Sequence, residues 1–171
     1  MIYIRAATVL TDEQILEMFE CDDYQRATLP VKQSSKHIVI GNDSEWIHIA
    51  DDFGYTLWHN PNTQKAIVKL SKSYDIFQNW IGDIDDSFAF SYFESGKCVR
   101  AFEYQHDPFK NTKVITTDSG KKLSAEPNSF DELMSSAFKM LPGVTRSLGI
   151  IREDDPLKHR VYGCLLERII S

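Results

Sequence analysis

The chain has 171 residues, of which 42% are hydrophobic and 26% charged, a composition typical of globular proteins that excludes collagen-like, low-complexity and wholly disordered chains. Nineteen Lys and Arg residues oppose 25 Asp and Glu residues, which gives a formal net charge of −6. This balance disfavours general binding to nucleic acid or to anionic membranes, because both are polyanions. We expect a single α+β domain over residues 1–171, large enough to fold without a metal ion or a disulfide.

We expect neither an export signal nor a membrane-spanning segment. Residues 1–5 lack the basic start and apolar run of a signal peptide, and no stretch approaches 18 apolar residues. We therefore expect a cytoplasmic protein. Cys21, Cys98 and Cys164 form no CxxC pair, so they are interpreted as reduced thiols, with Cys98 near Arg100 as a weaker candidate nucleophile.

The first third of the chain alternates short strands with one helix. Residues 2–9 alternate loosely and predict a strand. Thr11-Asp12-Glu13-Gln14 has the form of a capping box and predicts a helix over about 12–20. Residues 22–36 predict a loop, which is the best candidate for a mobile segment. A short apolar strand is predicted at 37–40.

The middle of the chain is harder to interpret. Residues 45–51 and 55–59 alternate around Asp52-Phe53-Gly54, which predicts a hairpin. Residues 63–70 are ambiguous and fit a strand. Ser73 can cap a helix whose apolar stripe is formed by Tyr74, Phe77, Trp80 and Ile81.

The strongest local pattern is the alternation of Phe88, Phe90 and Tyr92, followed by a turn at 94–97 and a returning strand at 98–104. Gly96 supplies the positive φ that a tight hairpin turn needs. A further strand is predicted at 113–117, with a turn at Gly120.

The last third predicts one more helix and an uncertain tail. Ser129-Phe130-Asp131-Glu132 is a second capping box, and Pro142-Gly143 is expected to end the helix that it opens. Residues 157–170 fit a helix or a strand, and Val161, Tyr162 and Gly163 favour a strand over about 160–168. The predicted fold is α+β: an antiparallel sheet of five to seven strands with two or three helices packed on one face.

The most suggestive polar cluster is Asp83, Asp85 and Asp86, three carboxylates that could hold Mg²⁺ or Ca²⁺. An EF-hand loop beginning at Asp83 would need Gly at its sixth position, where Phe88 stands. A solvated acidic loop is the favoured interpretation, ahead of partner binding and metal binding. No cofactor or metal is expected, and a small metal-dependent hydrolase using this cluster is the enzymatic alternative.

Two of the five histidines, His48 and His59, would lie nearly opposite each other in the predicted hairpin. A zinc site would need further ligands from elsewhere. Ordinary hydrogen-bonded sheet histidines are therefore favoured, and no catalytic residue is predicted.

Acidic residues gather in three groups along the chain. Residues 12–23 contain six Asp and Glu residues without one Lys or Arg, and further groups lie at 43–52 and 83–86. A solvated acidic face is the simpler interpretation, and a surface that captures a basic protein is the more specific one. The candidate partner-binding residues are Asp22, Asp23, Tyr24, Asp51, Asp52, Asp83, Asp85 and Asp86.

Two segments carry a resemblance. They are Gly82-Asp83-Ile84-Asp85-Asp86-Ser87-Phe88, continuing into Ser95-Gly96-Lys97 and Val99-Arg100, and the later run from Asp118 to Glu126. Together they resemble small bacterial cytosolic proteins that include the immunity proteins of toxin–immunity pairs. The resemblance implies a non-enzymatic protein that binds and neutralises a cognate toxin domain, with a basic nuclease as the expected target. A homodimeric scaffold module that uses an exposed sheet edge remains open as another alternative.

Overall fold

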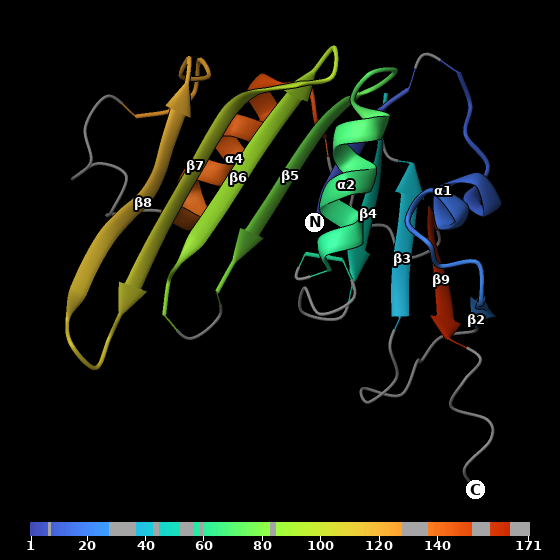
Figure 1. Ribbon diagram of the computed structural model, residues 1–171, viewed down its shortest axis with the longest axis horizontal. Coiled ribbons are helices and arrows are strands. Elements are labelled where there is room, and N and C mark those ends of the chain that lie inside the picture. The colour runs from blue at the N-terminus through green and yellow to red at the C-terminus, as the bar shows by residue number, and fades with distance from the viewer. Residues whose placement is uncertain are drawn as a thin grey trace, which may run out of the picture.

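A computed structural model describes residues 1–6, 8–27, 37–42, 45–51, 57–58, 60–82, 85–127, 137–151 and 158–164, with the side chains of 137–139 and 164 left out of the description. Figure 1 shows one broad sheet, with helices in front of it and behind it. The fold is therefore α+β, as predicted.

In the described part of the chain, the sheet has nine strands, all paired antiparallel, in the order β2-β9-β3-β4-β1-β5-β6-β7-β8. This is more than the five to seven strands predicted. The strands are β1 (Ile2–Arg5), β2 (Tyr24–Ala27), β3 (His37–Asn42), β4 (Trp46–Asp51), β5 (Asp75–Ile81), β6 (Phe88–Glu94), β7 (Lys97–Asp107), β8 (Thr112–Gly120) and β9 (His159–Cys164).

The helices lie on both faces of the sheet, so the prediction that they share one face is wrong. In Figure 1, α1 (Asp12–Met18) and α2 (Pro61–Leu70) lie in front, and α4 (Ala137–Ser147) lies behind β6 and β7. Strand β1 alternates between two cores: Ile4 packs beneath α1 and α2, and Tyr3 belongs to the core beneath α4. We call these sides the front face and the back face.

The N-terminal capping box is confirmed. The Thr11 side chain accepts a hydrogen bond from the Gln14 amide, and the Gln14 side chain accepts one from the Thr11 amide. Ile15 and Leu16 then point into the front core. The predicted loop after this helix contains β2, whose partner β9 comes from the far end of the chain, and residues 28–36 lie outside the described residues.

The predicted hairpin at 45–59 is wrong in its second arm. Strand β4 forms as expected, but β3 and β1 occupy its two sides, and Leu57 and Trp58 lie in a turn. The Asp51 carboxylate accepts a hydrogen bond from the Leu57 amide at 2.6 Å, so β4 is tied to this turn and not to another strand.

The next two elements are exchanged relative to the prediction. Residues 61–70 form α2, with Asn60 as the N-cap and Pro61 at the first position, where proline's missing N–H does no harm. Residues 75–81 form β5 and not a helix capped by Ser73. Strand β5 is central and is buried on both faces, so the spacing of its aromatic residues fits the apolar stripe of a helix as well as it fits a strand.

The β6–β7–β8 meander is confirmed. Ser95 and Gly96 form the first turn with φ of 50° and 77°, and β8 extends the predicted strand at both ends. Gly120 closes β8 at φ 85°, and an added Cβ there would lie 2.8 Å from the carbonyl carbon of Val99. The C-terminal strand is also confirmed, over 159–164.

Helix α4 runs through Pro142 and Gly143, where the sequence suggested an end. It ends at Ser147: Gly149 takes φ 76°, while the Ile150 amide donates to the Thr145 carbonyl at 2.9 Å. This is a Schellman motif, which ends the helix. Pro142 does not end it, because the φ of proline is compatible with a helix. The second predicted capping box, at 129–132, lies outside the described residues.

No helix in the described part of the chain has the length and apolar character needed to cross a membrane.

Candidate functional site

The acidic groups that the sequence separates converge at one end of the sheet. Tyr24 begins β2, Asp51 ends β4, and Asp85 and Asp86 lie between the end of β5 and the start of β6. The antiparallel registers place these positions at the same end, the lower end in Figure 1. Because strands lie about 4.8 Å apart, β2 and β4 are separated by about 14 Å, and β4 and β5 by about 10 Å.

We call Asp22, Asp23, Asp51, Asp85 and Asp86 the acidic end. Asp22, Asp23 and Asp86 are exposed, whereas Asp51 and Asp85 are half-buried. The other predicted partner-binding residues divide as follows: Tyr24 packs partly against the front core, and Asp52 and Asp83 lie outside the described residues.

The Asp85 carboxylate has a structural role in its turn. Its Oδ1 accepts a hydrogen bond from the Ser87 amide at 3.0 Å, and its carbonyl oxygen lies 2.8 Å from Nδ1 of His106. Among the described residues, no three His, Cys, Asp or Glu side chains are grouped so that they could hold a metal ion.

Of the predicted pair His48 and His59, the structure describes only His48, which lies on β4. Its neighbours across the sheet are Gly41 and Tyr3, and beyond Gly41 stands His159, whose ring packs edge-on against His48 at 4.9 Å between centroids. An added Cβ on Gly41 would lie 2.6 Å from Nε2 of His48, so this glycine makes room for the pair.

The segments that carry the family resemblance meet in a buried ion pair. Arg100 is 1% exposed; its Nη2 donates to Glu126 at 2.6 Å and its Nη1 to Asp118 at 2.6 Å. Burial by itself lowers the pKa of Arg100, but the hydrogen bonds that it donates to Glu126 and Asp118 outweigh burial, so the pKa is raised. These residues join β7, β8 and the segment after β8, so their evident role is structural.

This ion pair also removes the support for Cys98 as a nucleophile. The Arg100 guanidinium is committed to carboxylates, and desolvation raises the pKa of the Cys98 thiol. A raised pKa leaves less of the reactive thiolate at neutral pH.

A second polar cluster fastens α1 to the sheet. Asp12, at the start of α1, accepts hydrogen bonds from Arg160 and from the Tyr162 hydroxyl, both on β9. Burial raises the pKa of Asp12, but the hydrogen bonds from Arg160 and Tyr162 dominate, so its pKa is lowered. The cluster lies at the end of the sheet opposite the acidic end, since Arg160 also contacts Asn42 at the end of β3.

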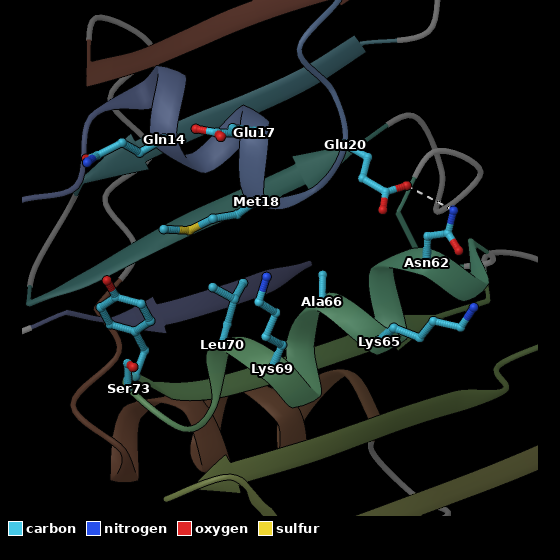
Figure 2. A pocket seen from close by; sticks show the side chains of 11 residues that line it. Gln14, Glu17, Met18, Glu20, Asn62, Lys65, Ala66, Lys69, Leu70 and Ser73 are labelled. Carbon is cyan, nitrogen blue, oxygen red and sulfur yellow. Dashed lines mark hydrogen bonds between the residues drawn. The ribbon is translucent and has the colours of Figure 1, made fainter.

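A groove of about 620 Å³ separates α1 from α2 on the front face (Figure 2). Glu17 and Glu20 line it from the α1 side, and Lys65 and Lys69 from α2. Glu20 accepts a hydrogen bond from the Asn62 side chain at 2.9 Å. The apolar lining is Met18, Ala66, Leu70 and Tyr74. Because the walls carry opposite charges, the groove selects no single sign of ligand.

A second hollow, of about 340 Å³, lies on the front face beside α2, over the part of the sheet that α2 leaves uncovered. Trp58 and Gln64 line one side, Glu103 and Thr117 the other, and its floor includes Ala89, Ser91 and Ala101. The sequence does not predict this hollow, because the alternation over 55–59 favours a strand at Trp58. The Asn60-Pro61 pair that begins α2 was the available signal.

Comparisons with protein-family models, with curated proteins and with solved structures found no significant match. A function therefore has to be inferred from this chain's own residues.

Proposed function

We propose that this protein is a non-enzymatic immunity protein that binds and neutralises a basic toxin domain, with a nuclease as the expected target. The observation that carries the proposal is the convergence of three acidic groups, distant in sequence, at one end of the sheet. The resemblance in the segments at 82–100 and 118–126 supplies the class of partner.

The physical basis is electrostatic capture. Carboxylates that project from turns keep much of their hydration, so they contribute more to the rate of encounter than to the strength of the final contact. The molecule's net charge of −6 acts in the same direction. Lys110 and Lys113 lie further along the sheet, at the β7–β8 turn, and Lys110 is paired with Asp107 at 3.2 Å.

The proposal is tested by expressing the product of the gene directly upstream with and without this chain in a sensitive host. The expected result is that this chain restores growth and that the two proteins purify together as one complex. Growth arrest that persists despite soluble expression of this chain would refute the proposal.

A homodimer is a second candidate, favoured by the long edge strand β8. Among the described strands, β8 pairs only with β7; it spans nine residues and exposes Val114 (52%) and Ile115 (37%). Such an edge can pair with a second copy. Sedimentation of the parent and of Ile115→Lys tests it: a dimer that the substitution converts to a monomer supports this candidate, and a monomeric parent excludes it.

A further inference from the structure

The hollow beside α2 has an aromatic wall that is held in place from two directions. Trp58 stacks on Trp80, with ring centroids 6.4 Å apart and planes inclined by 19°. The preceding residue, Leu57, donates its amide to the Asp51 carboxylate at 2.6 Å. An acidic residue that the sequence assigned to partner contact thus positions the turn that carries Trp58.

The floor is polar and made of small side chains. Gln78 is 4% exposed and donates to Ser91 Oγ at 2.9 Å and to Gln64 Oε1 at 3.2 Å. Ala89 and Ala101 add no bulk above the sheet. The floor is therefore already ordered, and its low side chains leave room for a ligand.

Glu103 supplies the only charge among the described residues that line the hollow. Its carboxylate accepts a hydrogen bond from the side-chain amide of Gln105 at 2.9 Å and a long one from the Thr117 hydroxyl at 3.5 Å. No Lys or Arg in the described part of the chain forms an ion pair with it. Trp80, Ala89 and Glu103 share one row across β5, β6 and β7, so Trp80 and Glu103 are about 10 Å apart along the sheet.

We propose that this hollow receives an arginine side chain of the partner protein, stacked on Trp58 and paired with Glu103. A guanidinium is flat, stacks on indole rings and bonds a carboxylate through two parallel N–H groups. The side-chain oxygens of Gln64 and Ser91 can accept hydrogen bonds from its remaining N–H groups. The inference depends on the proposed function, because it assigns one contact of a basic partner.

The probe is L-argininamide, with L-citrullinamide as the matched control, since citrulline has nearly the same shape without the guanidinium charge. Two-dimensional NMR follows the indole N–H signals, with Trp58 assigned from Trp58→Phe. We expect a saturable shift at Trp58 with a dissociation constant of about 1 mM to 10 mM, typical of one exposed contact. Glu103→Gln should weaken binding about fivefold, and Glu13→Gln on α1 should not change it.

Three results would overturn the proposal. Equal binding of citrullinamide would mark a neutral amide site, and binding of maltose without binding of L-argininamide would mark a sugar site. An unchanged affinity in Glu103→Gln would exclude the ion pair.

The partner complex tests the docking role separately. Glu103→Gln should raise the dissociation rate of the complex about fivefold, and an unchanged rate would refute the docking role while leaving the proposed function in place. Failure of the growth test refutes the proposed function, and with it the docking role, even where L-argininamide binds.

Discussion

Replacing Glu126 by Gln should destabilise the protein strongly, because it leaves the Arg100 guanidinium buried beside an uncharged group. Both side chains are 1% exposed, and the Glu126 carboxylate accepts bonds from Nε and Nη2 of Arg100 and from the Leu123 amide. Breaking a buried ion pair from one side costs about 3–5 kcal/mol. Asp118 still contacts Nη1 at 2.6 Å, so the lower end, about 3 kcal/mol, is expected.

Urea denaturation and thermal melting measure this loss. In a chain of this length, about 3 kcal/mol lowers the melting temperature by about 6–12 °C. The control is Asp118→Asn, whose parent side chain is 48% exposed and so should contribute less than about 1 kcal/mol after solvent screening. The double substitution Arg100→Met/Glu126→Leu removes both charges and should recover most of the loss. If Glu126→Gln is no less stable than Asp118→Asn, the reasoning is wrong.

Three further changes are expected to have measurable effects. Gly41→Ala should cost about 1–3 kcal/mol of unfolding free energy, because the added methyl group forces the buried His48 ring aside. The loss should be smaller when His48→Ala is already present, and a double-mutant cycle measured by urea denaturation tests this. Burial, followed by the hydrogen bond to Asp12, raises the pKa of Tyr162 to about 12. The stabilisation of the fold by the neutral Tyr162 hydroxyl is therefore complete below about pH 10 and is lost as the pH rises toward 12. Tyr162→Phe should flatten the dependence of the unfolding free energy on pH over that window, and an unchanged profile would contradict the assignment. Thr11→Ala should cost about 1 kcal/mol through the lost cap of α1, and equal stability by chemical denaturation would count against it.

The sequence predicts local structure well where one pattern dominates. The α1 capping box needs only four consecutive residues, and the β6–β7 hairpin combines a run of alternating aromatic residues with a Gly96 turn. In both segments, local hydrogen bonding and side-chain period favour the same element.

Prediction fails where burial on both faces removes the alternation. Strand β5 has neighbours on both sides and a core on both faces, so Phe77 and Trp80 are compatible with either period. The exchange of α2 and β5 follows, although Asn60 and Pro61 mark the start of the helix.

The candidate site was predictable residue by residue but not as an arrangement. Asp22, Asp51 and Asp85 lie at the same end of one sheet because β9 links β2 to β3 and β1 links β4 to β5. These pairings join distant parts of the chain, and no local pattern specifies them. The same holds for the hollow, because Trp58 and Glu103, which are distant in sequence, line its two sides.

The most direct test of the central claim is the association rate of this protein with the proposed toxin partner, measured by stopped flow at low and high salt. Asp22→Lys/Asp23→Lys changes the acidic end, and Glu13→Lys/Glu45→Lys makes the same charge change with exposed residues at the opposite end. We predict that the first variant associates about tenfold more slowly at low salt, that the second stays close to the parent, and that the difference disappears near 0.5 M salt. Equal slowing of both variants, or of neither, would contradict the account.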